Sequence, residues 1–137
     1  IKNIGDVFFT ERTGPLTLPG SNSQYHKYKA LYEPSVDIKY VIGDSTKIPQ
    51  IDTTDLLFID TCHNANTLSK ELELHGNQAQ KFILLHDTEA FVEVGEEETN
   101  KGTGLWDAIT PWLRRNTHWK IHEHYEYNNG LTILRRN

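Results

Sequence analysis

The stretch Asp55-Leu-Leu-Phe-Ile-Asp60-Thr-Cys-His63 decides the fold, together with a second stretch of the same kind, Lys81-Phe-Ile-Leu-Leu-His86-Asp87-Thr88. Each is a short apolar run that ends in aspartate and histidine, and such runs predict buried strands of a parallel sheet. The carboxyl ends of parallel strands meet at one edge of an α/β sheet, where these folds bind their ligands. We therefore expect a site at this edge, made of the side chains of Asp60, His63, His86 and Asp87.

The composition places the chain among ordinary folded domains. Its 137 residues are 36% hydrophobic and 24% charged, which predicts one domain over residues 1–137 with a buried core. The formal net charge of −5 argues against a nucleic acid or an anionic membrane as a partner. No run approaches the roughly 20 apolar residues of a membrane span. These bounds predict neither nucleic acid nor membrane among the partners.

Cys62 is the only cysteine of the sequence, which excludes a disulfide within the chain. A lone thiol fits a reducing compartment, so the cytoplasm is the expected location. We also expect no signal peptide, because the first residues do not have the pattern of one. Because the first residue is Ile1 rather than methionine, we expect the start to be processed, trimmed or the edge of a fragment.

Strand and helix patterns alternate through the chain. Strands are expected at residues 4–9, 37–42, 55–60 and 82–86, followed by a hairpin of residues 119–127 and 131–134. Helices are expected at residues 24–33, 64–80 and 105–113. In the second helix, Lys70, Glu71 and Glu73 are expected on the face opposite Leu68 and Leu72.

Two local signals refine the C-terminal part. Pro111 lies inside the last predicted helix, which predicts either a kink or a late helix start. The turn Asn128-Asn129-Gly130 separates the two hairpin strands, and Asn-Gly is the strongest short hairpin signal. Strand–helix–strand units that end in an antiparallel pair predict an α/β fold, a doubly wound Rossmann-like sheet with helices on both faces.

The order of these motifs resembles that of the class I S-adenosylmethionine-dependent methyltransferases. The motifs that carry the resemblance are Ile4-Gly-Asp, Asp55–His63, a helix with Glu-Leu, His86-Asp87-Thr88, Gly104-Leu-Trp-Asp-Ala-Ile and Asn128-Asn-Gly-Leu-Thr-Ile-Leu. Within that class, the chain looks most like the metal-dependent O-methyltransferases that include the cephamycin and mycinamicin-sugar enzymes. The similarity covers residues 36–136.

The resemblance implies roles for the four residues at the strand ends. Asp60 and Asp87 match positions that hold a divalent metal, usually magnesium, and His63 matches the general base. His86 is expected either as a further metal ligand or as a residue that orients its neighbours. A hard cation held by carboxylates lowers the pKa of an acceptor hydroxyl, and an imidazole then removes the proton near neutrality.

The resemblance also implies S-adenosylmethionine as the cofactor, bound by two loops and by one of the strand ends. The residues expected to contact it are Thr13, Gly14, Gly43, Asp44, Ser45 and Asp60. Among these, Asp44 matches the position that faces the adenine.

The N-terminal region departs from the family pattern. The family's glycine-rich loop resembles Phe-Gly-x-Arg-Thr-Gly-x-Ser-Thr, whereas Phe9-Thr10-Glu-Arg-Thr-Gly-Pro-Leu-Thr17 has Thr10 in place of the first glycine. That glycine normally lets the backbone approach the ligand closely. About ten residues separate Gly14 from the helix expected at residues 24–33, too few for a full helix and a second strand. Residues 1–35 are therefore expected to be a divergent or truncated cofactor-loop region, with an incomplete strand–helix–strand unit.

Each strand-end residue also has a structural interpretation. Asp60 and Asp87 would then be turn or helix-capping carboxylates, His63 a surface residue and His86 a structural one. Cys62 is expected to be a small buried thiol rather than a nucleophile.

Two further features allow more than one interpretation. The acidic loop of residues 89–103 is either solvated surface or a substrate lid. Three C-terminal histidines invite a zinc site, but their spacing matches no standard zinc motif. These histidines are His118, His122 and His124.

The leading functional hypothesis is metal-assisted O-methyltransfer from S-adenosylmethionine to a hydroxyl of a sugar or another small polar metabolite. A catalytically inactive remnant that serves as a binding or oligomerisation module is the alternative, favoured by the short N-terminal region. A metal-dependent hydrolase built on the same carboxylates and histidines is a third. Because losing the second strand would expose a sheet edge, and such edges are often covered by pairing, we also expect a homo-oligomer.

Overall fold

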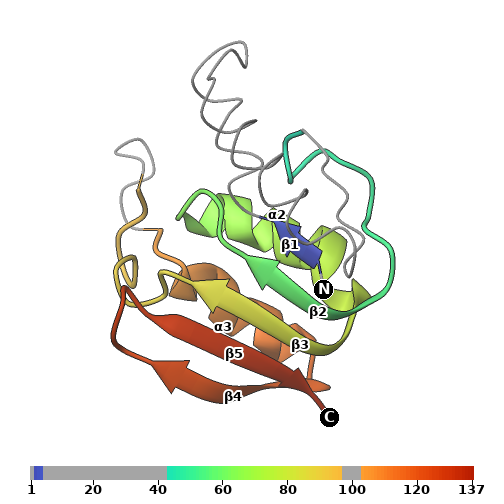
Figure 1. Cartoon of the computed structure of the whole chain (residues 1–137). Helices are drawn as coiled ribbons and strands as arrows, with labels where there is room; N and C mark the ends of the chain where they lie inside the picture. Colours follow the sequence, from blue (N-terminus) through green and yellow to red (C-terminus); the bar gives the residue numbers. More distant parts are fainter. Residues whose placement is uncertain (1, 5–42, 97–102) are drawn as a thin grey trace, which may run out of the picture.

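The computed structural model describes residues 2–4, 43–96 and 103–137. Its strands form one five-stranded sheet in the order β1-β2-β3-β5-β4 (Figure 1). The strands are β1 (Lys2–Ile4), β2 (Thr54–Ile59), β3 (Ala79–His86), β4 (Trp119–Tyr125) and β5 (Leu131–Arg136). The helices are α2 (Ala65–His75), the short 3₁₀ helix η1 (Gly76–Gln78) and α3 (Trp106–Arg115).

The sheet is parallel at one side and antiparallel at the other. β1, β2 and β3 pair in parallel, with Ile59 of β2 opposite Leu85 of β3. β5 then runs antiparallel to both β3 and β4, so the last strand of the chain is inserted between its two predecessors. The expected α/β sheet with a C-terminal antiparallel hairpin is confirmed.

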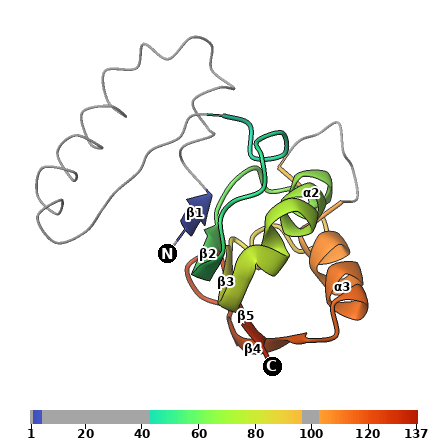
Figure 2. The ribbon, with the colours of Figure 1, turned by 90° about the vertical axis from the view of Figure 1, so that its right-hand side faces the viewer.

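The core lies between the sheet and the two helices, which cover the same face of it (Figure 2). Along β2 and β3, alternate side chains point into this core, as the two-residue period of a strand requires. The fully buried strand residues include Leu57, Ile83 and Leu134, and α3 adds Trp112. The helix expected at residues 24–33, a candidate for the opposite face, lies outside the described residues, as do most of the first strand and the strand at 37–42. No described helix is long and apolar enough to cross a membrane.

Interactions at its two ends determine where helix α2 begins and ends. Asn64 caps its N-terminus, because its side-chain oxygen accepts a hydrogen bond from the backbone N–H of Thr67 at 2.9 Å. At its other end the chain tightens into η1 at Gly76, where an added Cβ would lie 2.7 Å from Trp112. The expectation that this helix runs to residue 80 is wrong, since β3 already begins at the fully buried Ala79.

Helix α3 contains Pro111 without starting late. The helix begins at Trp106 and continues to Arg115, so a start after the proline is wrong. A proline inside a helix costs about 3 kcal/mol, because it removes one backbone hydrogen bond and crowds the preceding turn. The buried side chains of Ile109 and Trp112, on either side of the proline, offset that cost by packing into the core.

The residues in the turn of the C-terminal hairpin have left-handed backbone conformations. Asn128 and Asn129 have φ angles of 54° and 65°, the conformation that a type I′ turn requires at both central positions. Gly130, with φ of 94°, donates its backbone N–H to the carbonyl of Tyr127 at 3.1 Å. Asparagine tolerates this region better than other residues with side chains, so the hairpin prediction is confirmed.

Replacing Ile83 by alanine is expected to lower the free energy of unfolding by about 2–5 kcal/mol, because the side chain is fully buried and its removal leaves a cavity. Ile121 on β4 is the matched control, since it is 44% exposed and Ile121→Ala should cost far less. Urea denaturation measures both. Equal losses in the two variants would show that the core is not where the sheet and helices place it.

Candidate active site

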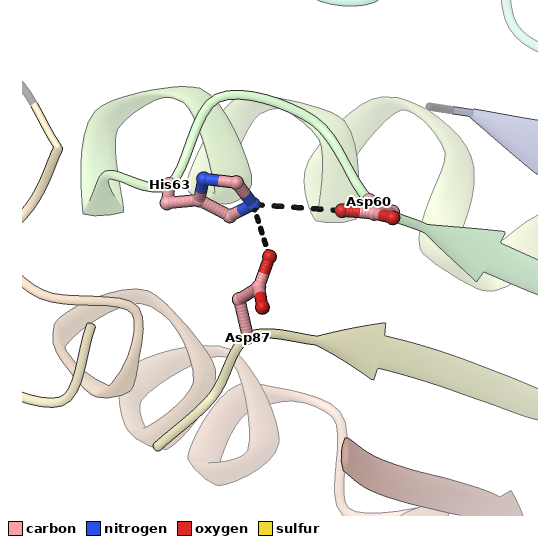
Figure 3. Close-up of side chains that lie close together, drawn as sticks. All are labelled: Asp60, His63 and Asp87. Carbon is pink, nitrogen blue, oxygen red and sulfur yellow. Dashed lines mark hydrogen bonds and ion pairs between the residues drawn. The ribbon is translucent and has the colours of Figure 1, made fainter. Parts of the chain in front are cut away.

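Parallel pairing brings the ends of β2 and β3 together. Because Ile59 lies opposite Leu85, Asp60 and His86 follow at the same level of the sheet, and Asp87 comes next. In the described residues, Asp60, His63 and Asp87 each offer a ligand atom, and these atoms lie within 4.8 Å of one another (Figure 3). The structure thus brings together the residues that the sequence placed at this edge.

His63 is surrounded by carboxylates. Its Nε2 lies 2.7 Å from Oδ2 of Asp87 and 3.5 Å from Oδ1 of Asp60, as drawn in Figure 3. Its Nδ1 lies 3.1 Å from Oε2 of Glu96, and its ring stacks on Phe91 with centroids 4.6 Å apart. With both nitrogens engaged and one ring face covered, the imidazole is held in a single orientation.

These contacts move two pKa values. Burial alone would lower the pKa of His63, but the hydrogen bond to Asp60 and the charges of Asp87 and Glu96 outweigh it, so the pKa lies above 6.5. The hydrogen bond from His63 lowers the pKa of Asp60, with the nearby imidazole of His86 adding to the effect. Asp60 is therefore ionised at neutral pH, and His63 is a stronger base than a free imidazole.

Asp87 presents its two oxygens to different partners. Oδ2 contacts His63, whereas Oδ1 faces Nδ1 of His86 at 3.2 Å. Both Oδ1 and that nitrogen are buried, and neither makes a hydrogen bond to a described residue. Nδ1 of His86 is also 3.8 Å from Oδ1 of Asp60. Buried polar atoms are rarely left without a partner, and a bound ion is one ordinary reason.

The donor set fits a divalent cation. Carboxylate oxygens are the ligands of hard cations, and imidazole is a common additional ligand for softer ones. Asp60 and Asp87 would supply the oxygens, and His86 or His63 a nitrogen. The orphaned atoms Oδ1 of Asp87 and Nδ1 of His86 are the observation that supports this fit.

The turn expected to face the cofactor is stabilised by hydrogen bonds and an ion pair of its own side chains. The carboxylate of Asp44 accepts hydrogen bonds from the backbone N–H and hydroxyl of Thr46 at 2.9 and 2.7 Å and pairs with Lys47 at 2.6 Å. The bond from Lys47 and those from Thr46 lower the pKa of Asp44 to about 2. Ser45 is buried, and Gly43 packs against Ile48 with no room for a Cβ. The other expected contacts, Thr13 and Gly14, lie outside the described residues.

Glu71 is a residue that the sequence assigned to the wrong face of its helix. It is fully buried, and its carboxylate accepts hydrogen bonds from Ser45 at 2.5 Å and Thr61 at 2.9 Å. Burial raises its pKa to about 7, against the lowering effect of these two bonds. Its burial could have been suspected from its position beside Leu72 and one turn before His75. His75 is also buried, and its ring contacts the carbonyl of Ser45.

The sequence did not single out Glu96 as a site residue. It lies in the acidic loop that was expected to be either solvated surface or a substrate lid. Besides its contact with the His63 ring, its backbone N–H donates to the carbonyl of His63 at 2.9 Å. The described start of this loop therefore lies against the site. Residues 97–102 lie outside the described residues, so the lid interpretation stays a prediction.

The C-terminal histidines have other partners. His118 contacts Asn77, and His124 lies between Glu89 at 2.8 Å and Thr132 at 2.9 Å. Within the described ranges, none of the three belongs to a group with the geometry of a metal site, in agreement with their spacing. The sulfur of Cys62 accepts a hydrogen bond from the Asn64 side chain at 3.0 Å, and the residue is half-buried.

Comparison with known proteins supports the fold. No protein-family model and no curated protein matches the chain. A solved structure from Staphylococcus aureus, provisionally described as a caffeoyl-CoA O-methyltransferase, is similar over 84% of this chain with a TM-score of 0.54 and 13% sequence identity. The chain spans 59% of that protein's length. The sheet thus has the fold of a methyltransferase, while the expected branch of the class stays a prediction.

Glu71 should make folding stability fall as the pH rises from about 4.5 to about 7. The unfolded chain loses the proton near its ordinary pKa of 4.5, whereas the folded chain keeps it to about 7. A stabilisation of roughly 3 kcal/mol is therefore present below this window and lost above it. Urea denaturation across the window, in the wild type and in Glu71→Gln, isolates this contribution.

Glu73→Gln is the matched control for that comparison, because Glu73 lies on the same helix with its side chain 64% exposed. It should keep the wild-type pH dependence. If Glu71→Gln kept it too, the buried carboxyl would not be the titrating group.

The pKa of His63, measured by NMR titration of its ring, should lie above 6.5. Glu96→Gln should lower it, because the variant removes a charge and a hydrogen-bond acceptor beside Nδ1. Glu93→Gln, an exposed change in the same loop, should leave it unaltered. A His63 that titrates below 6.5 in the wild type would contradict the geometry described above.

Proposed function

We propose that the chain is an S-adenosylmethionine-dependent O-methyltransferase that is assisted by a divalent cation and acts on a hydroxyl of a sugar or another small polar metabolite. The observation that carries the proposal is the position of His63, whose Nε2 is held between Asp60 and Asp87 at the carboxyl edge of a methyltransferase-like sheet. The location in the cytoplasm and the homo-oligomer are parts of the same proposal.

In this reaction the bond between the methyl group and the sulfonium sulfur breaks, and a bond from the methyl group to the acceptor oxygen forms. The acceptor hydroxyl loses its proton, and neutral His63 is the proposed base that takes it. The raised pKa of His63 favours that transfer near neutral pH, because a base works best when its pKa is close to the working pH. Glu96, at Nδ1, and Phe91, against the ring, hold the imidazole in place beside Asp60 and Asp87.

Asp60 and Asp87 would hold the cation, magnesium or another divalent ion, with His86 as a further ligand. A cation bound there lowers the pKa of the acceptor hydroxyl and so eases its deprotonation. Asp60 is suited to this role because its pKa is lowered, which keeps the carboxylate charged.

The cofactor is proposed to bind beside this cation site. Glu71 links Ser45, in the proposed cofactor turn, to Thr61, which directly follows Asp60. The turn of Gly43, Asp44 and Ser45 and the strand end are therefore neighbours, as a transfer between cofactor and acceptor requires. Thr13 and Gly14 complete the proposed cofactor contacts.

Calorimetry with S-adenosylmethionine tests the proposal, with and without magnesium. We expect binding, and about tenfold weaker binding by Asp44→Asn, because a charge-assisted hydrogen bond contributes roughly 1.5–3 kcal/mol. Asp55→Asn is the matched control, since this exposed aspartate pairs with Lys81 on the surface. Circular dichroism shows whether both variants fold.

No binding at millimolar cofactor would overturn the methyltransferase proposal. The alternative from the sequence, an inactive remnant used for binding or oligomerisation, would then be the better description. Binding that Asp44→Asn leaves unchanged would show that the cofactor uses other residues.

A further inference from the structure

We propose that the cation site selects a transition-metal ion such as Fe²⁺ or Zn²⁺ over Mg²⁺, with Asp60, Asp87 and His86 as its protein ligands. The inference deepens the proposed function and rests on its cation site. It assigns the nitrogen ligand to His86 and leaves His63 as the base.

The first supporting observation is the way Asp87 divides its oxygens. Oδ2 lies 2.7 Å from Nε2 of His63, so that oxygen already has a strong partner. Oδ1 points to the other side, toward Nδ1 of His86 at 3.2 Å. The side chain is only 10% exposed, so water has little access to either oxygen. One carboxylate thus serves a base on one side and an open ligand position on the other.

The second observation is that two buried polar atoms on this side of Asp87 make no hydrogen bond to a described residue. Oδ1 of Asp87 and Nδ1 of His86 are the two buried side-chain polar atoms that make no hydrogen bond within the described residues. Nδ1 of His86 lies between two carboxylates, 3.2 Å from Oδ1 of Asp87 and 3.8 Å from Oδ1 of Asp60. A cation bound beside Asp60 would give the two unsatisfied atoms, Oδ1 of Asp87 and Nδ1 of His86, a common partner.

The chemistry of these donors sets the preference for the metal. Mg²⁺ binds almost entirely through oxygen and keeps several waters, whereas imidazole favours iron, nickel, copper and zinc. A site with two carboxylates and one imidazole therefore gains more from a transition metal than from Mg²⁺. His86 suits this role because it lies on β3 and its backbone pairs with Leu131, so the imidazole is fixed by a strand rather than by a loop.

His63 is the competing nitrogen donor, since it belongs with Asp60 and Asp87 to a group of suitable geometry. Both of its ring nitrogens, however, already lie against carboxylates, Nε2 against Asp87 and Nδ1 against Glu96. Ligation through Nε2 would break the closer of these contacts. Nδ1 of His86 also lies near carboxylates, 3.2 Å from Oδ1 of Asp87, but it makes no hydrogen bond within the described residues, so ligation there would break none.

Titration of the whole chain with Co²⁺, followed by visible absorption and by proton NMR, tests the inference. Co²⁺ replaces Fe²⁺ or Zn²⁺ and shifts the ring N–H signal of a bound histidine far from the ordinary range. We expect one bound Co²⁺, one such shifted signal, and no displacement by a hundredfold excess of Mg²⁺. In His86→Ala, the signal should vanish and the affinity for Co²⁺ should fall at least tenfold.

His122→Ala is the matched control, because His122 lies on β4 with its side chain 38% exposed, and it should keep both signal and affinity. Loss of the shifted signal in His63→Ala but not in His86→Ala would overturn the assignment. Displacement of Co²⁺ by an equal concentration of Mg²⁺ would overturn the metal preference. If a variant does not fold, the two measurements on the wild type still test the inference. These are the shifted histidine signal and the displacement of Co²⁺ by Mg²⁺.

These outcomes are separate from the test of the proposed function, because the titration contains no S-adenosylmethionine. A chain that binds Co²⁺ through His86 but no cofactor would keep this inference and lose the methyltransferase proposal. A chain that binds the cofactor but no Co²⁺ would keep the methyltransferase proposal and lose this inference.

Discussion

The parallel pairing of β2 with β3 is the constraint on which the site depends. It places Ile59 opposite Leu85, so that Asp60 and His86 emerge at the same level of the sheet. A slip of one residue would turn every side chain of a strand to the other face, exposing Leu57 and Ile83, which are fully buried. The apolar core therefore fixes the register, and the register in turn brings the polar residues together.

A second constraint is the buried carboxylate of Glu71. Burying a carboxyl group without partners is costly, and hydrogen bonds with the hydroxyl groups of Ser45 and Thr61 offset part of that cost here. The two donors belong to loops that are 16 residues apart in the sequence, on opposite sides of β2. One side chain of α2 thus joins the turn after residue 42 to the loop after the strand.

Much of this arrangement was predictable, because its signals are local. The apolar runs before Asp60 and His86 predicted the two strands, and two adjacent asparagines before Gly130 predicted the hairpin turn. Since parallel strands end at a common edge, the meeting of the site residues followed from these runs alone. The geometry agrees with each step.

The rest depends on contacts between distant residues. Glu71 looked like a surface residue because its neighbours Lys70 and Glu73 are polar, and only its bonds to Ser45 and Thr61 explain its burial. The contact of Glu96 with His63 crosses 33 residues of chain and has no counterpart in the local pattern. In α3, the helix persists through its proline because of tertiary packing, which outweighs an unfavourable local preference.

The direction of the Asp87 carboxylate is set far away in the sequence, by the C-terminal hairpin. Asp87 has a φ of 59°, a left-handed conformation that is unfavourable for a residue with a side chain unless its surroundings hold it. The carbonyl of Asn129, in the hairpin turn, accepts the backbone N–H groups of both Glu89 and Ala90 at 2.9 Å. These bonds fix the chain just after Asp87.

Side chains reinforce the same connection. The hydroxyl of Thr132 on β5 donates to that of Thr88, the residue next to Asp87, and both threonines are fully buried. His124 of β4 joins Thr132 to Glu89, so a continuous chain of hydrogen bonds runs from the hairpin to the loop. Hydrogen bonds thus hold both the backbone and the side chains of the loop that follows Asp87, and they stabilise the strained conformation of Asp87. The hairpin therefore supports the site from outside, because its hydrogen bonds hold the loop after Asp87 and not the cluster of carboxylates and imidazoles itself.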